Sequence, residues 1–204
     1  MKHLAPLPWT SVKIAWISGV SRPGTRALSP DQLGFIDSLP GDARWKLRTN
    51  FPYGLAAEEF RRTTLPVASV VNLTHFVLAS QPLRKPWRRR AWRDLRGSCE
   101  LLLLVTNSCG AQMVQALERE SEPKSRLSIL SLGSVDWGAS RLNRVTVRGS
   151  LDRVGVPGMR RADITIDGIG HMDYARSERV RALACDWASG ELRRAGFIAA
   201  EDPS

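Results

Sequence analysis

The chain has 204 residues, a length typical of one large domain, so we expect a single domain over residues 1–204 with its core in about 12–197. Hydrophobic residues make up 43% of the sequence and charged residues 25%, a balance that supports a buried core and excludes a mainly disordered protein. The formal net charge of +10 raises a nucleic acid, a membrane surface or an anionic substrate as partners without choosing among them.

Cysteine content indicates a protein of a reducing compartment, and hydropathy indicates no membrane-spanning helix. The three cysteines are too few and odd in number for a disulfide framework, and no two are spaced like metal ligands. No apolar run approaches the roughly 18 residues that a membrane-spanning helix needs. Residues 1–20 resemble a signal sequence, with a basic start and an apolar run over 14–20. Lys13 interrupts the segment 1–20, and we interpret the apolar run as a buried strand. We therefore expect a cytoplasmic location and no membrane span.

Short apolar runs alternate with longer segments of helical period along the chain. The expected strands cover residues 12–18, 43–49, 100–106, 127–132, 144–148 and 164–166. The expected helices cover residues 55–62, 86–98, 111–120 and 177–195, and residues 67–80 suit either a helix or a strand. This alternation predicts an α/β three-layer sandwich, with a mainly parallel sheet and helices on both faces. The run 100–106 is the most apolar, which places it at the centre of the sheet.

A tight turn joins the central strand to the helix that follows it. Its sequence is Thr106-Asn107-Ser108-Cys109-Gly110. A serine on such a turn projects its hydroxyl above the sheet, and the positions two before and two after it must be small because the backbone is crowded. The N-terminus of the next helix points at Ser108, where its N–H groups favour the oxyanion that forms during nucleophilic attack. Ser108 is therefore a candidate nucleophile.

This turn and two later segments together resemble the α/β-hydrolase superfamily, particularly its small esterases and lipases without a lid. In that family the catalytic residues follow the chain order serine, acid, histidine. Residues 145–154 resemble the strand-and-acid segment, with Asp152 in the acid's place, and residues 164–172 resemble the last strand and histidine loop, with His171. The resemblance covers roughly residues 12–197. It implies an α/β-hydrolase fold without a cap domain, since only residues 133–143 separate two of the expected strands.

The resemblance implies a serine hydrolase that cleaves carboxylic esters through Ser108, His171 and Asp152 and an acyl-enzyme intermediate. The substrate would be a small-molecule ester. The oxyanion hole would consist of the backbone N–H groups of Cys109 and Val20. No cofactor or metal is implied, and the sequence contains no glycine-rich phosphate loop.

Two residues compete for the roles assigned above. Asp136 follows the preceding strand and is an alternative acid, because some family members carry the acid at that place. Cys109 is an alternative nucleophile, since thiolates are good nucleophiles. That choice would put Asn107 and Ala111 at the two crowded positions, which is a poorer fit.

Other features keep two further classes of function open. Thr106 stands where the family usually has glycine, and Ser18-Gly19 stands where a His-Gly pair is common, which leaves a non-catalytic binding module as an alternative. Residues 84–93 interleave basic and aromatic side chains, a composition that suits contact with a nucleic acid. Nucleic acid is the less favoured partner, because arginine outnumbers lysine along the whole chain. The sequence indicates no oligomeric state.

Overall fold

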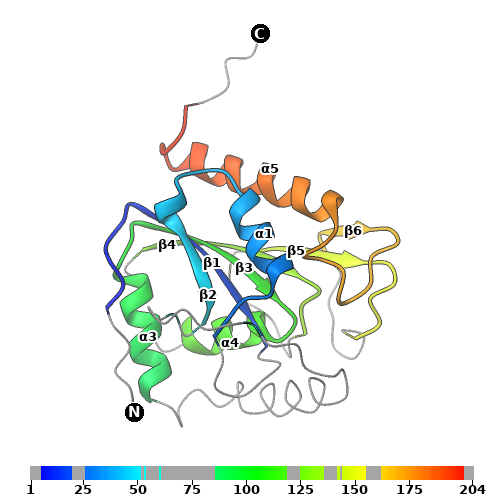
Figure 1. Cartoon of the computed structure of the whole chain (residues 1–204), viewed down its shortest axis with the longest axis horizontal. Helices are drawn as coiled ribbons and strands as arrows, with labels where there is room; N and C mark the ends of the chain where they lie inside the picture. The colour runs from blue at the N-terminus through cyan, green and yellow to red at the C-terminus, as the bar shows by residue number, and fades with distance from the viewer. Residues whose placement is uncertain are drawn as a thin grey trace.

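The structure is a computed structural model that describes residues 6–19, 26–51, 53, 60, 86–118, 125–135, 142, 144–154 and 162–199. A six-stranded sheet with the order β2-β1-β3-β4-β5-β6 lies at its centre, and every strand pair is parallel (Figure 1). The strands are β1 Val12–Ser18, β2 Lys46–Asn50, β3 Leu101–Asn107, β4 Arg126–Leu132, β5 Arg144–Gly149 and β6 Ile164–Ile166. The predicted α/β class with a parallel sheet is confirmed.

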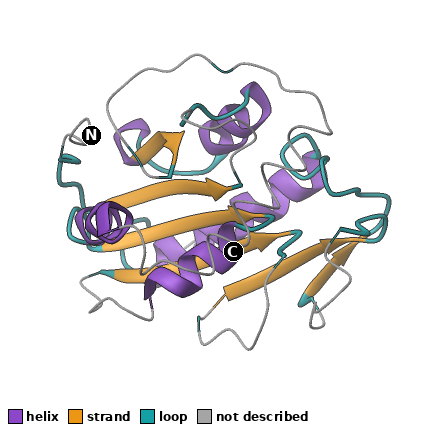
Figure 2. Ribbon diagram, turned by 90° about the horizontal axis from the view of Figure 1, so that it is seen from below, coloured by secondary structure: helices purple, strands orange, loops and turns teal. Residues whose placement is uncertain are grey.

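Strand β3 is the central strand, as its composition predicts. It pairs residue for residue with β1 on one side and with β4 on the other. All residues from Leu101 to Thr106 are buried, because helices cover both faces of the sheet at this point. Seen from below, the strands lie side by side across the molecule (Figure 2). The carboxyl ends of β3, β4 and β5 therefore meet at one edge of the sheet.

Two helices pack on each face of the sheet. Helices α1 (Pro30–Ser38) and α5 (Glu178–Arg194) cover one face, and α3 (Pro86–Arg96) and α4 (Gly110–Glu118) cover the other (Figure 1). On the first face the ring of Trp16 meets that of Phe35 edge to face at 5.3 Å. On the second face Trp92 meets Phe51 at 6.1 Å. This three-layer packing buries both sets of alternating side chains of β1.

Helix α3 contains most of the basic run singled out in the sequence. Arg88 and Arg96 are buried on it, and so is Trp92. The Trp92 indole N–H donates to the Glu118 carboxylate at 2.8 Å, and Arg96 forms an ion pair with the same carboxylate at 3.2 Å. Trp92 and Arg96 of the basic helix thus contact the end of α4 through Glu118. In the part of the chain that the structure describes, no helix combines the length and apolar character needed to cross a membrane.

The structure corrects two parts of the sequence prediction. Helix α1 was not predicted, although Ser29 and Gln32 form a capping box at its start and Pro30 occupies its first turn. The strand predicted over 43–49 begins only at Lys46, because residues 43–45 form a 3₁₀ helix in which the Asp42 carboxylate accepts from the Arg44 N–H. The predicted segments 55–62 and 67–80 lie outside the described residues, apart from residue 60.

Candidate active site

Ser108 lies in the turn between β3 and α4. Its φ of +53° makes it the only non-glycine residue with a positive φ among those described. This conformation costs a side chain with a Cβ about 1–2 kcal/mol, and such residues concentrate at functional sites. The Ser108 N–H donates to the Leu132 carbonyl at 3.3 Å, and the Ser108 carbonyl accepts from the Val135 N–H at 3.0 Å. The turn after β4 therefore holds Ser108 in its unusual conformation.

The two crowded positions beside Ser108 are accommodated in different ways. A Cβ on Gly110 would lie 2.2 Å from the carbonyl oxygen of Ile17, so only glycine lets α4 begin this close to β1. Thr106 is buried, and its hydroxyl shares a 2.8 Å hydrogen bond with that of Ser131. The Ser131 hydroxyl is also hydrogen-bonded to that of Ser134. This cluster of hydroxyls provides polar partners for the buried Thr106 side chain.

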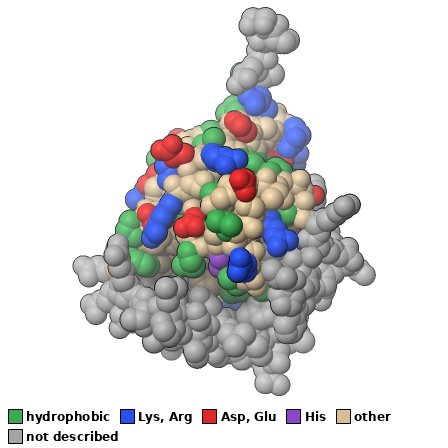
Figure 3. Space-filling view, turned by 90° about the vertical axis from the view of Figure 1, so that its right-hand side faces the viewer, with side chains coloured by type: hydrophobic (Ala, Val, Ile, Leu, Met, Phe, Trp, Pro, Cys, Tyr) green, Lys and Arg blue, Asp and Glu red, His purple; other side chains and the backbone are tan. Residues whose placement is uncertain are grey.

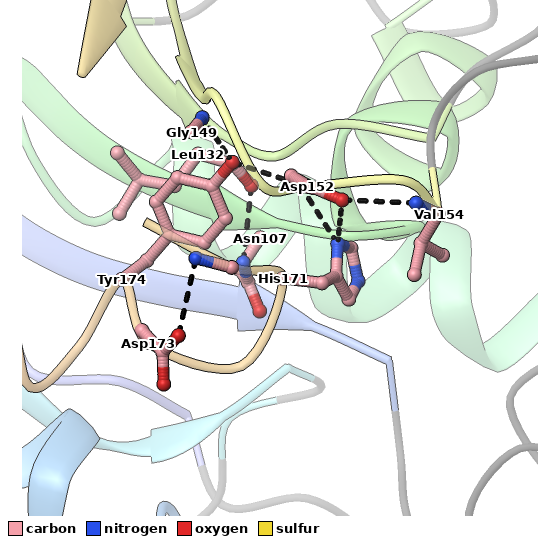
Figure 4. A network of polar contacts seen from close by, with 9 residues as sticks. Asn107, Leu132, Gly149, Asp152, Val154, His171, Asp173 and Tyr174 are labelled. Atoms are coloured by element: carbon pink, nitrogen blue, oxygen red, sulfur yellow. Dashed lines mark hydrogen bonds and ion pairs between the residues drawn. The ribbon is translucent and has the colours of Figure 1, made fainter. Parts of the chain in front are cut away.

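Asp152 and His171 form a hydrogen-bonded pair beyond the ends of β5 and β6 (Figure 4). The His171 Nδ1 atom lies 3.1 Å from Asp152 Oδ1 and 3.0 Å from Oδ2. The carboxylate is fully buried, whereas the imidazole keeps 13% of its side-chain surface exposed. Because a carboxylate only accepts hydrogen bonds, Nδ1 carries the proton and Nε2 is left as the basic nitrogen.

Tyr174 is a third member of this network, and the sequence analysis missed it. Its hydroxyl donates to Asp152 Oδ2 at 2.8 Å and accepts from the Gly149 N–H at 2.8 Å (Figure 4). The Val154 N–H donates to the other carboxylate oxygen at 3.0 Å. The sequence carried only a weak signal for Tyr174, an aromatic residue three positions after the candidate histidine. Each oxygen of the Asp152 carboxylate thus accepts from one further donor besides His171.

These contacts determine the charge of the acid. Burial by itself raises the pKa of Asp152, but hydrogen bonds from His171 and Tyr174, the charge of the imidazole and the Val154 N–H together lower that pKa below its usual range. Burial raises the pKa of Tyr174 far above its usual value, so the phenol stays protonated and continues to donate. Asp152 is therefore an anion held by donors at neutral pH.

The turn after β4 lies between Ser108 and the acid. Gly133, with a φ of +52°, is in that turn, and a Cβ there would lie 2.6 Å from Asp152 Oδ2 and 2.4 Å from the Tyr174 ring. The residue before it, Leu132, accepts the hydrogen bond from Ser108. The structure thus joins Asp152 to His171 and places Ser108 across one turn from them. Among the described contacts, no hydrogen bond links Ser108 to His171.

Cys109 is the last residue before α4 and is buried. Its backbone N–H lies at the N-terminal end of the helix and donates to no other residue that the structure describes. Burial raises the pKa of the Cys109 thiol to about 11, so the sulfur is protonated at neutral pH and is a poor nucleophile. Cys109 is therefore suited to offer its N–H rather than its sulfur.

Two predicted residues cannot be placed in this site. Val20, the second expected oxyanion donor, and Asp136, the alternative acid, both lie outside the described residues. Within the described ranges no three His, Cys, Asp or Glu side chains gather in a way that could hold a metal ion.

Comparison with known proteins adds to the description of the fold. No protein-family model and no curated protein matches the chain. A candidate alpha/beta hydrolase of unknown function from Agrobacterium tumefaciens is 12% identical, with a TM-score of 0.43, and the match covers 98% of this chain and 94% of that one. A serine hydrolase without a lid from Xanthomonas campestris is 15% identical, with a TM-score of 0.39, and the match covers 96% and 88% of the two chains. The likeness concerns the fold alone, and no residue role is transferred from either protein.

Proposed function

We propose that the protein is a serine hydrolase that cleaves carboxylic esters, with Ser108 as nucleophile, His171 as general base and Asp152 as the acid that orients it. The observation that carries the proposal is the Asp152–His171 pair. A buried carboxylate that accepts from Nδ1 leaves Nε2 available to take a proton. The left-handed backbone of Ser108, on a strand-to-helix turn at the same edge of the sheet, supports its role as the nucleophile.

In the proposed reaction His171 Nε2 removes the hydroxyl proton of Ser108 as Oγ attacks the ester carbonyl carbon. The Cys109 N–H, together with a second N–H expected at Val20, stabilises the negative charge on the carbonyl oxygen. His171 then protonates the departing alcohol, which leaves an acyl group on Ser108. Water, deprotonated by the same nitrogen, hydrolyses this acyl-enzyme. Catalytic hydrogen bonds absent from a free enzyme often form only when substrate binds, and we expect this for Ser108 and His171.

Labelling with a fluorophosphonate tests the proposal directly, because this probe reacts covalently with activated serines. The folded protein should be labelled on Ser108, as mapped by mass spectrometry, and should hydrolyse p-nitrophenyl acetate. Ser108→Ala should lose both properties without a fall in melting temperature. Ser38→Ala, at the end of α1, is the matched control and should keep both. A folded protein that takes no label and has no turnover, or that is labelled on another serine, would contradict the proposal. Absence of both is also what the binding-module alternative predicts.

A further inference from the structure

Exposed hydrophobic side chains are concentrated around the acid and the histidine. Among the described residues five large hydrophobic side chains are exposed, and three of them lie within two positions of Asp152 or His171. These three are Leu151, Val154 and Met172, with exposed fractions of 61%, 55% and 68%. We call them the apolar rim. Clustered apolar side chains that remain exposed in a folded protein mark binding surfaces.

The first part of the apolar rim comes from the loop after β5. Leu151 is a central residue of a turn that the Asp152 N–H closes by donating to the Gly149 carbonyl at 3.0 Å. The Leu151 N–H donates to the Ile169 carbonyl at 3.1 Å, which fastens this turn to the histidine loop. Val154 is tied to the acid by its own N–H. Figure 4 shows Val154 beside the carboxylate that holds the His171 ring.

The second part of the rim comes from the histidine loop itself. His171 and Met172 are the two central residues of a turn that the Asp173 N–H closes by donating to the Gly170 carbonyl at 3.1 Å. The Asp173 carboxylate accepts from the Gly170 N–H at 3.1 Å and reinforces the turn. The imidazole and the Met172 side chain therefore leave one short turn as neighbours, the imidazole against Asp152 with 13% of its side chain exposed and Met172 toward the solvent. In the face view of Figure 3, hydrophobic side chains are interspersed with basic and acidic ones on the coloured part of the surface.

We infer that the apolar rim binds a hydrocarbon chain of the substrate, so that the protein prefers esters with long apolar groups to short ones. This inference rests on the proposed function, because the reacting ester must lie against His171 and its substituents must then pass over neighbouring side chains. Burying a hydrocarbon chain on Leu151, Val154 and Met172 removes apolar surface of both partners from water. A short acyl or alkyl group would leave this surface exposed.

The rate constants for esters of increasing chain length test the inference. We expect kcat/KM to rise from p-nitrophenyl acetate through butyrate to octanoate, by up to about fourfold for each methylene that reaches the rim. A parallel series of ethyl, butyl and octyl acetates reports whether the chain that binds is the acyl or the alcohol part. In Val154→Ser/Met172→Ser the ratio of the octanoate to the acetate value should fall by about tenfold. Both side chains are exposed, so this double variant should fold, and its melting temperature checks that.

A matched control is Trp9→Ser, because Trp9 is also an exposed large hydrophobic residue but precedes β1 at the opposite edge of the sheet. It should leave the ratio unchanged. A ratio that is unchanged in the double variant, or a parent protein that prefers short chains in both series, would overturn the inference. A second outcome would also overturn the inference. In it the parent protein, but not the double variant, co-sediments with phosphatidylcholine vesicles, and the ratio of the octanoate to the acetate value is the same in both proteins. The apolar rim would then contact a lipid surface. The proposed function survives these outcomes as long as Ser108 takes the fluorophosphonate label.

Discussion

The serine half and the acid–histidine half of the candidate site are held by different kinds of interaction. Ser108 is positioned by the main chain, through its left-handed backbone and the close approach of Gly110 to β1. The pair of Asp152 and His171 is positioned by hydrogen bonds to the carboxylate, which the Tyr174 hydroxyl and the Val154 N–H donate. The first half therefore depends on backbone geometry, and the second depends on individual polar atoms and their protonation. Substitutions that remove a single polar atom should therefore affect the acid–histidine half and leave the serine half intact.

The largest expected effect comes from Asp152→Asn, which alters the second half and leaves the first intact. An amide at this position can donate to Nδ1 and thereby favour the wrong histidine tautomer, so kcat for p-nitrophenyl acetate should fall by about 10⁴. Steady-state kinetics at pH 7 measure this loss. Asp136→Asn is the comparison variant and should keep most of the activity. The reverse result would transfer the role of the acid to Asp136.

A smaller effect is expected for Tyr174→Phe, which removes a donor from a buried carboxylate and leaves the Gly149 N–H without its acceptor. The free energy of unfolding in urea should fall by about 1.5–3 kcal/mol, the usual contribution of a hydrogen bond to a charged group. The factor by which kcat falls should be larger than the factor by which KM changes. Tyr53→Phe is a matched control, since its buried hydroxyl donates to the Trp16 carbonyl, away from the Asp152 network. Equal kcat losses in both variants would show that Tyr174 acts only through stability.

The free energy of unfolding should depend on pH through the acid–histidine half of the site, because Asp152 is ionisable. Burial raises the pKa of Asp152, but the hydrogen bonds from His171, Tyr174 and Val154 outweigh it and lower the folded-state pKa. The ionised group therefore stabilises the folded state above the unfolded pKa of about 3.9, and this contribution disappears as the pH falls through the lower folded value. The difference in unfolding free energy between the parent and Asp152→Asn should be constant near neutral pH and shrink below about pH 4. A difference that grows as the pH falls would contradict this sign.

The smallest effect is expected for Cys109→Ala, which changes a side chain of the serine half without changing its backbone. The Cys109 thiol is protonated at neutral pH because burial raises its pKa to about 11. Esterase activity should stay within about twofold, since the residue is expected to contribute only its N–H. Iodoacetamide at pH 8 should alkylate the half-buried Cys185 before Cys99 and Cys109, both of which are buried. Rapid alkylation of Cys109 with loss of activity would instead favour the thiol as nucleophile.

The serine half could be located from the sequence because its signals are contiguous. An apolar strand, a tight turn and a helix follow one another, and the structure places β3 at Leu101–Asn107 and α4 at Gly110–Glu118, each within two residues of the expected bounds. The serine therefore sits at the predicted strand-to-helix junction. Its role as nucleophile, like the roles of Asp152 and His171, stays a prediction.

Other parts of the molecule were less accessible to sequence reasoning, for two reasons. Helix α1 has a capping signal at Ser29 and Gln32, but its hydrophobic residues show only a weak helical periodicity. A prediction based on hydrophobic periodicity therefore misses this helix. Tyr174 has only a weak local signal, its place three positions after His171, because its partner Asp152 is 22 residues away and their contact depends on how two loops fold together. A hydrogen bond between loops is set by tertiary structure, which composition and periodicity do not encode.

The backbone of Ser108 has a consequence for the energy landscape of the whole chain. Serine intrinsically avoids a φ of +53°, whereas glycine adopts it freely, so local preference and global fold disagree at this position. This disagreement makes the turn a point of local frustration. The conformation of Ser108 is maintained by the pairing of β3 with β4 on one side and by the close approach of α4 to β1 on the other. If either neighbour loosened, we expect the turn to relax toward a conformation that serine prefers.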